Sequence, residues 1–428
     1  MMGGPALGKA LRYGAAAVGP IGSAGAQFLL SLALLRALDA RDFGAFSFLL
    51  VASQFSWGLW SALFCAPLPI LFHGSRGAER DALMLSLFSA NLVVAALAGG
   101  LFLALALALG LPSDAATLFA AYAAFALLRW FARAHAYAEG RPLRTTVSDL
   151  VYAVTLLIGV SAVLWTDGGA PRIAYGALFV SAVLGMTPFG LAYLRRQFLS
   201  VRPAAVKGYL PVWRRHSGWS LLGVLTTEAT ANSHAYLVTA FFGPAAFAPV
   251  AASALVTRPV GVAMNALTEF ERAQMARAIG GGRIGEALAA ARFFRLAMVA
   301  AWLATAAAVA ALFAWAPRLV FPPEYPLRFL ATAGALWMIV AGVRLLRQPD
   351  SALLQAAGEF RPLALASVWS SGVSVVAVAS LLWSAGVLPS IFGILAGEIA
   401  YALWVRRRRA LWLRDRAAPA HTAEAVAA

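Results

Sequence analysis

Residues 82–109 read ALMLSLFSANLVVAALAGGLFLALALAL and contain no charged side chain. The hydrocarbon core of a bilayer is about 30 Å thick, and a helix of about 20 apolar residues spans it. This stretch is therefore long and apolar enough to cross a membrane. Because its backbone groups must be hydrogen-bonded within the segment once water is excluded, we expect it to be an α-helix.

Similar apolar runs recur along the whole chain of 428 residues. The hydrophobic fraction is 61%, the charged fraction is 12% and the mean hydropathy is +0.77, whereas soluble domains are about one-quarter charged. This composition excludes a soluble fold and predicts an all-α polytopic membrane protein. We expect twelve spans, at about 15–35, 44–65, 82–109, 115–137, 146–166, 172–194, 217–242, 245–266, 291–315, 327–347, 362–384 and 387–405.

The positions of the basic residues predict the orientation of these spans. Only five of the 34 Lys and Arg residues lie in the connections that follow odd-numbered spans, and the other 29 lie on the opposite side. Lys and Arg mark the cytoplasmic side of membrane proteins. Both termini are therefore predicted to face the cytoplasm, and the net charge of +16 reflects topology rather than a nucleic-acid partner. The five exceptions are Arg36, Arg41, Arg172, Arg318 and Arg328.

The longest polar connection divides the expected spans into two groups of six. We predict an N-terminal six-helix lobe at 1–194, a cytoplasmic linker at 195–216 and a C-terminal six-helix lobe at 217–405. A basic stretch and then a disordered cytoplasmic tail are expected at 406–428. Residues 269–295 are expected to form short helices at the membrane interface.

A short internal match indicates that the six-span unit is duplicated. Residues 136–143 read AYAEGRPL and residues 356–363 read AAGEFRPL, which are identical at five of eight positions. The copies follow the fourth and the tenth expected span. Because six is an even number, both lobes would have the same orientation and be related by an axis along the membrane normal. The alternative is that Arg-Pro simply ends one helix and begins the next.

Three segments resemble motifs of the multidrug/oligosaccharidyl-lipid/polysaccharide (MOP) exporter superfamily, in its polysaccharide-transporter and O-antigen-flippase-like branch. Residues 35–44 (LRALDARDFG) resemble the turn that joins the first two spans of polysaccharide transporters. Residues 241–247 (FFGPAAF) look like the corresponding turn of the second lobe, and residues 354–358 (LQAAG) resemble the stretch after the tenth span. Unlike many cation-coupled drug extruders of the superfamily, this chain has no carboxylate at 15–35.

The resemblance implies a fold, a cargo and a location. The fold would be two six-helix bundles around a central cavity that opens alternately to either side of the bacterial inner membrane. The cargo would be an oligosaccharide linked to undecaprenyl pyrophosphate, moved from the inner to the outer leaflet for surface polysaccharide biosynthesis. Membrane lipids would be further ligands, and the resemblance suggests a polysaccharide polymerase or glycosyltransferases as partner proteins. No cofactor is expected.

Arginines within the expected spans are the candidate substrate-binding residues. A charge at membrane depth costs a few kcal/mol on insertion scales, so it usually faces a cavity or a partner. Arg129, Arg133, Arg258 and Arg344 qualify, and a guanidinium binds phosphate through two parallel hydrogen bonds. Arg129 and Arg258, one from each lobe, are predicted to clamp the pyrophosphate. The alternative is that these side chains extend to the inner headgroups.

Two glutamates are the candidate ion-coupling residues. Glu228 lies near the middle of the span expected at 217–242, and Glu398 lies halfway along the last span. The alternative for Glu228 is a structural salt bridge to Arg258. We expect Asp149 to pair with Arg144 or Arg141, which lie within two turns of it.

Two other function classes stay open. An ion-coupled exporter of drugs or metabolites would have the same fold. A membrane-embedded glycan-transferring enzyme would need grouped carboxylates or histidines at the outer face, but the longest expected outer connection, 316–326, offers only Glu324. The single cysteine, Cys65, has no Cys or His neighbour at metal-ligand spacing. We therefore predict neither a catalytic residue nor a metal site.

Overall fold

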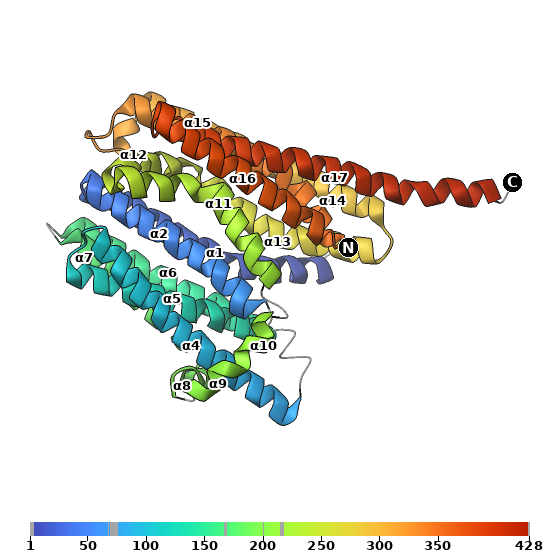
Figure 1. The fold of residues 1–428 in the computed structure, drawn as a ribbon, viewed down its shortest axis with the longest axis horizontal. Helices are drawn as coiled ribbons and strands as arrows, with labels where there is room; N and C mark the ends of the chain where they lie inside the picture. The colour runs from blue at the N-terminus through green and yellow to red at the C-terminus, as the bar shows by residue number, and fades with distance from the viewer. Residues whose placement is uncertain are drawn as a thin grey trace. The chain divides into compact units, whose positions relative to one another are not determined.

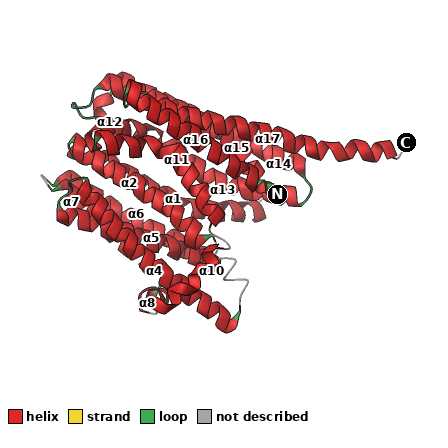
Figure 2. Cartoon of the chain, viewed as in Figure 1, coloured by secondary structure: helices red, strands yellow, loops and turns green. Residues whose placement is uncertain are grey.

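The structure, a computed structural model, describes residues 4–66, 68, 76–166, 169–199, 201–214 and 218–426. All regular elements in these ranges are helical (Figure 2). Figure 1 labels the α-helices, which are α1 (Gly4–Ala37), α2 (Ala40–Trp60), α4 (Gly77–Ala108), α5 (Ser113–Ala138), α6 (Pro142–Trp165), α7 (Ala170–Leu184), α8 (Leu191–Leu199), α9 (Pro203–Val206), α10 (Leu210–Val212), α11 (Gly218–Phe242), α12 (Pro244–Ala254), α13 (Arg258–Gly280), α14 (Ile284–Trp315), α15 (Leu327–Ala356), α16 (Phe360–Ala385) and α17 (Ser390–Val426).

Within the described residues, ten helices are long and apolar enough to cross a membrane, and each overlaps one expected span. The remaining two expected spans, 217–242 and 387–405, lie on α11 and α17. Both are long helices, but the middle of α11 is polar and α17 runs directly into a block of arginines. The chain is thus an all-helical, multi-span membrane protein. The ten candidate spans are Val18–Ala37, Ala40–Cys65, Gly77–Ala108, Ser113–Ala138, Pro142–Trp165, Ala170–Phe189, Pro244–Val262, Ile284–Trp315, Leu327–Ala356 and Phe360–Ala385.

The C-terminal segment differs from the expectation of disorder. α17 continues as one helix to Val426, well past the ends of its neighbours in unit 2, α15 and α16 (Figure 1). Alanine has the highest intrinsic helix propensity, and the alanine-rich sequence after Arg414 extends the helix for that reason. The helix is also anchored, because Trp412 is buried against the ends of α13 and α14.

The chain folds as two compact units. Unit 1 comprises Met1–Leu225, Thr239–Ala251 and Val320–Pro322. In this unit α1 packs against α6, α5 packs against α4 and α7, and α6 packs against α7. Aromatic side chains fill the core at the end predicted to be cytoplasmic, where Phe88 meets Phe131 edge-to-face.

Unit 2 comprises Thr226–Val238, Ala252–Leu319 and Pro323–Ala428. Its closest helix pair is α16 and α17. A Cβ placed on Gly397 of α17 would lie 2.5 Å from the Cβ of Ser374 on α16. Small residues let two membrane helices approach closely and gain packing energy, and this pair uses glycine for that purpose.

The segment predicted as a linker, 195–216, includes short helices that are docked on α4. The backbone N–H of Arg202 donates to Ser89 Oγ at 3.1 Å. Asn91 Nδ2 donates to Oε1 of the fully buried Gln197 at 3.0 Å. These bonds fix α8 and the turn after it to the middle of α4. Residues 200 and 215–217 lie outside the described part of the chain.

The internal repeat is visible in the turns after α5 and α15. Each helix ends at a left-handed glycine, Gly140 with φ +72° and Gly358 with φ +81°. The residue after each glycine closes the same hydrogen bond to the carbonyl five positions earlier, as in a Schellman cap. The two bonds are Arg141 N to Ala136 O at 2.8 Å and Glu359 N to Leu354 O at 2.9 Å. Equivalent residues are therefore 218 positions apart.

This register corrects the one that the sequence match suggested. The shared letters of AYAEGRPL and AAGEFRPL are 220 positions apart, two more than the turns. Glu139 consequently follows the last residue of α5, whereas Glu359 precedes the first residue of α16. The match identified the correct pair of turns but the wrong residues within them, because the backbone repeat is set by the glycines.

The same offset of 218 residues relates α6, which bonds α1, to α16, which bonds α11. In unit 1, Gln27 Nε2 donates to Tyr152 Oη at 2.9 Å, and Ser23 Oγ donates to the carbonyl of Asp149 at 3.2 Å. Ser23 and Gln27 are four residues apart and share one face of α1.

In unit 2 the positions 218 residues beyond Tyr152 and Asp149 are Ser370 and Ser367. Their hydroxyls bond those of Thr230 at 3.2 Å and Thr226 at 2.8 Å. Thr226 and Thr230 are again four residues apart. Each unit therefore contains the same helix pair in the same register, with different polar side chains at the contact.

Candidate functional site

Arg129 and Arg133 both bind Asp149 inside unit 1. The Asp149 side chain has no exposed surface, and those of Arg129 and Arg133 are 9% and 14% exposed. Arg129 Nη2 forms an ion pair with Asp149 Oδ1, and Arg133 Nη1 lies 3.0 Å from the same oxygen. The spacing of four residues places both guanidiniums on one face of α5, as the sequence predicts.

The expected pairing of Asp149 with Arg144 or Arg141 is wrong. Arg144 Nη1 instead donates to the carbonyl of Phe189 at 2.9 Å. Arg141 lies 3.7 Å from Glu139 at the helix turn. Both arginines stand at the start of α6, where solvent or loop carbonyls can satisfy them, whereas Asp149 is deep enough to need a buried partner.

Arg129 makes two further contacts within unit 1. Its Nε donates to Ser148 Oγ at 3.0 Å, and that hydroxyl donates to the carbonyl of Gly185 at 2.5 Å. The guanidinium carbon lies 4.5 Å from the ring centroid of Tyr152, a cation–π distance. Arg129 is thus held by three side chains of its own unit.

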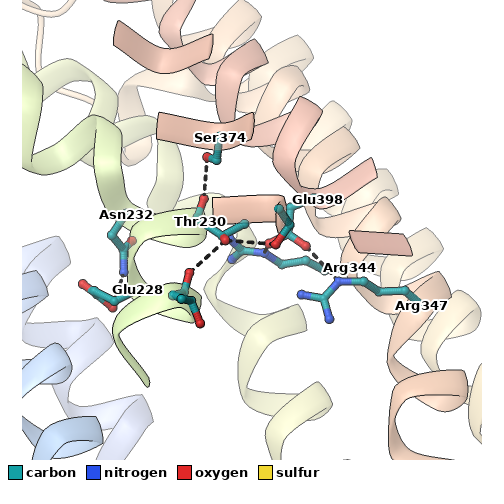
Figure 3. Close-up of polar contacts among 9 residues, drawn as sticks. Glu228, Thr230, Asn232, Arg344, Arg347, Ser374 and Glu398 are labelled. Carbon is teal, nitrogen blue, oxygen red and sulfur yellow. Dashed lines mark hydrogen bonds and ion pairs between the residues drawn. The ribbon is translucent and has the colours of Figure 1, made fainter. Parts of the chain in front are cut away.

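A second buried cluster joins α15 to α17 in unit 2 (Figure 3). The Glu398 side chain is 2% exposed, and each of its oxygens takes one arginine. Arg344 Nε lies 2.5 Å from Oε1, and Arg347 Nε lies 2.8 Å from Oε2. Arg347 also lies over the ring of Tyr401, at 4.3 Å. Because both oxygens hold fixed cations, Glu398 is poorly placed to bind a coupling ion.

Glu228 has a different environment, made of neutral donors on its own helix. Asn232 Nδ2 donates to Oε2 at 3.1 Å, and the Tyr236 hydroxyl donates to Oε1 at 2.5 Å. The three residues follow one another at four-residue intervals along α11, so they form a polar stripe. Figure 3 shows Asn232 beside Glu228 on this helix.

The structure also places one arginine near the Glu228 stripe. Arg344 is near enough for its charge to act on both Glu228 and His234. The proposed bridge between Glu228 and Arg258 is not present, since the described contacts of Glu228 within ion-pair distance include no arginine. Glu228 is therefore influenced by a cation without being bound to one.

Arg258 stands at a break in the helix, as the following proline predicts. α12 ends at Ala254, a 3-10 turn covers Leu255–Thr257, and Arg258 begins α13. The side chain is half-buried. Among the described residues, Arg258 forms no ion pair with a carboxylate, which distinguishes it from the other three candidate arginines.

The sequence analysis did not identify two residues of these clusters, Arg347 and Tyr236. Arg347 follows Arg344 by three residues, a spacing that places both on one face of α15. Tyr236 follows Glu228 by eight residues, which is again the same face. Helical spacing from the charged residues already identified was the signal that could have found both.

Comparison with known proteins bears on the fold. No family model and no curated protein sequence matches the chain. A multidrug resistance MATE family transporter of the MOP superfamily, in an inward-facing conformation, matches with a TM-score of 0.63 and 15% identity, over 91% of this chain and 95% of that one. The eukaryotic MATE transporter AtDTX14 matches with a TM-score of 0.61 and 15% identity, over 95% of this chain and 98% of that one. A multidrug resistance MATE family transporter of the superfamily in an outward-facing conformation matches with a TM-score of 0.59 and 16% identity, over 94% of this chain and 96% of that one. Over most of its length, the chain therefore has the fold of the MATE transporters of the MOP superfamily.

Proposed function

We propose that this protein is an ion-coupled exporter of small organic molecules, either drugs or metabolites, with Glu228 as the coupling residue. The observation that carries the proposal is the environment of Glu228, a carboxylate in the polar middle of α11. Its hydrogen bonds within the described part of the chain come from Asn232 and Tyr236. The similarity to structures described as multidrug resistance transporters also supports an exporter of small organic molecules.

Asp149 and Glu398, the other two carboxylates discussed above, are less suited to this role. Asp149 and Glu398 each hold two arginines, and a fixed cation opposes the uptake of a proton or of a second cation. A carboxylate with neutral donors can alternate between a proton and an organic cation. Because one charge cannot serve both ligands at once, inward proton movement would drive the cargo outward.

A second candidate is a flippase for lipid-linked oligosaccharides at the bacterial inner membrane. The observation that favours it is Arg258, a half-buried guanidinium at a helix break with no carboxylate bound to it in the described chain. A pyrophosphate would satisfy such a group with paired hydrogen bonds. The three polysaccharide-transporter motifs support the same candidate.

Deletion of the gene distinguishes the two candidates. Loss of an exporter should raise the retention of a fluorescent organic cation in the cells and leave lipid-linked saccharides unchanged. Loss of a flippase should instead cause complete lipid-linked repeat units to accumulate facing the cytoplasm. Complementation with the Glu228→Gln variant should fail in the first case, and complementation with Arg258→Ala should fail in the second.

A further inference from the structure

The four consecutive arginines of α17, residues 406–409, divide into two pairs with different surroundings. Nε and Nη2 of Arg408 both donate to Glu359 Oε2, at 3.1 and 2.7 Å. Nε of Arg409 lies 3.1 Å from Asp350 Oδ1. Asp350 belongs to α15, and Glu359 directly precedes α16. The second pair of arginines therefore joins α17 to the rest of unit 2.

The first pair, Arg406 and Arg407, is exposed, as is Arg414 two turns further along the helix. None of these three side chains forms an ion pair or a hydrogen bond with a residue in the described ranges. The carboxylates that bind the arginine block there, Glu359 and Asp350, already hold Arg408 and Arg409. The three exposed guanidiniums are thus free to take an anion from outside the protein.

These three arginines lie on one face of α17 that begins as an apolar surface. Arg407 follows Leu403 by four residues and Arg414 follows by eleven, which are intervals of about one and three helical turns. Leu403 is exposed, whereas Val405 and Trp412, on the opposite side of the helix, are buried. Along its exposed face, α17 therefore changes from apolar to basic at Arg406.

This change matches the boundary between the acyl chains and the headgroups of a bilayer. An apolar side chain such as Leu403 suits the acyl chains, and tryptophan, here the partly exposed Trp404, is enriched at the level of the headgroups. A guanidinium binds phosphate through two parallel hydrogen bonds. The face accordingly fits a phospholipid whose phosphate lies at Arg406 and Arg407.

The contacts of the other two arginines hold α17 in place at this point. Trp412 is buried among residues of α13 and α14, and Arg408 is bonded to Glu359. Because the backbone is already ordered, binding a headgroup costs mainly the side-chain freedom of the exposed arginines. Arg361, which is exposed and two residues from Glu359, adds a further guanidinium at the same end of unit 2.

We propose that Arg406, Arg407 and Arg414 form a binding surface for anionic phospholipids in the leaflet on the predicted cytoplasmic side. Arg408 and Arg409 hold the helix that presents this surface. Phosphatidylglycerol and phosphatidylcholine carry the same phosphate, but choline adds a positive charge that arginines repel, so the surface should select phosphatidylglycerol. This inference does not depend on the cargo of the transporter.

Competition between two lipids tests the proposal. The full-length protein is released for native mass spectrometry from mixed micelles that contain equal amounts of phosphatidylglycerol and phosphatidylcholine with the same acyl chains. The wild type should retain phosphatidylglycerol preferentially. The Arg406→Gln, Arg407→Gln variant should lower this preference about tenfold or more, since each basic side chain near an anionic surface contributes about fivefold in affinity. An unchanged preference would overturn the proposal.

Arg172→Gln with Arg328→Gln is the matched control, because it removes the same charge from exposed arginines on the predicted outer side. This variant should keep the preference, and an equal loss in both double variants would show that net charge, rather than the face of α17, selects the lipid.

Arg408→Gln separates the two roles within the arginine block. It should lower the melting temperature but keep the lipid preference, because Glu359 already occupies that guanidinium. Loss of the preference in this variant would contradict the division into two pairs. A wild type that shows no lipid preference but melts at a higher temperature in inorganic phosphate would reassign the surface to a soluble anion.

Discussion

Arg129 and Arg347 occupy equivalent positions in the two halves of the chain, each eleven residues before the left-handed glycine that ends its helix. Each binds a buried carboxylate, but the two carboxylates come from different neighbours. Arg129 bonds Asp149 on α6, and Arg347 bonds Glu398 on α17. Both halves therefore place an arginine on the helix that ends at the left-handed glycine, which is α5 or α15. The carboxylate that pairs with this arginine lies on a different helix in each half.

Because Asp149 is the carboxylate that pairs with both Arg129 and Arg133, Asp149→Asn should destabilise unit 1 strongly. Removing one partner of a buried ion pair costs about 3–5 kcal/mol, since the remaining charge stays buried and unpaired. Thermal unfolding in detergent should show a large decrease in melting temperature. The double variant with Arg129→Gln should recover part of the loss.

Asp114→Asn is the matched control for this substitution. Asp114 lies 3.6 Å from Arg172, but both side chains are at least half exposed. An exposed pair contributes about 1 kcal/mol or less, so the melting temperature should hardly change. Equal losses in the two variants would contradict the account of the Asp149 cluster.

The close approach of α16 and α17 predicts that Gly397→Ala destabilises unit 2. The added Cβ would lie 2.5 Å from Ser374 Cβ and 3.0 Å from the carbonyl oxygen of Ser370. Overpacking of this kind costs about 1–3 kcal/mol. Gly372→Ala is the control, because a Cβ at that position of α16 meets nothing within 4 Å. A Gly397→Ala variant as stable as the control would show that the helices can separate at no cost.

Glu271 gives a prediction about pH. It lies on α13 beyond the apolar segment that ends at Val262, and it is 5% exposed. Burial raises the pKa of its carboxyl above the usual value. The folded state therefore binds a proton more tightly than the unfolded state, and stability is lost as the pH rises through the folded pKa.

Glu271→Gln should consequently raise the melting temperature at a pH of about 8 and have little effect near pH 3, where both states of the wild type are largely protonated. Glu286→Gln, whose side chain is 61% exposed, should have no effect at either pH. A Glu271→Gln effect of the same size at both pH values would exclude the titration as its cause.

The fold could be predicted from the sequence, whereas the individual side-chain contacts could not. Apolar runs predicted ten spans that the structure contains as candidate membrane helices, because length and hydropathy alone determine whether a helix suits a bilayer. The partner of Asp149 could not be predicted in the same way. Arg144 is nearer in sequence, but the choice of Arg129 depends on how α5 packs against α6.

The pairing of the carboxylates in the candidate site could not be predicted from the sequence for the same reason. Membrane depth selected the charged residues as candidates, but it could not tell a carboxylate that is paired with arginines from one that is not. Glu228 and Glu398 are indistinguishable by position in the span, but α15 supplies arginines to the oxygens of Glu398, whereas Asn232 and Tyr236 of its own helix bond those of Glu228. That difference depends on tertiary packing, which hydropathy does not record.

In the proposed mechanism, Glu228 couples proton movement to the export of an organic cation. The most direct measurement is proton release from purified protein in weakly buffered detergent solution when tetraphenylphosphonium is added, followed with a pH indicator. The wild type and the Glu324→Gln control should release protons as the cation binds, and Glu228→Gln should bind the cation weakly and release none. Undiminished proton release by Glu228→Gln would contradict the account.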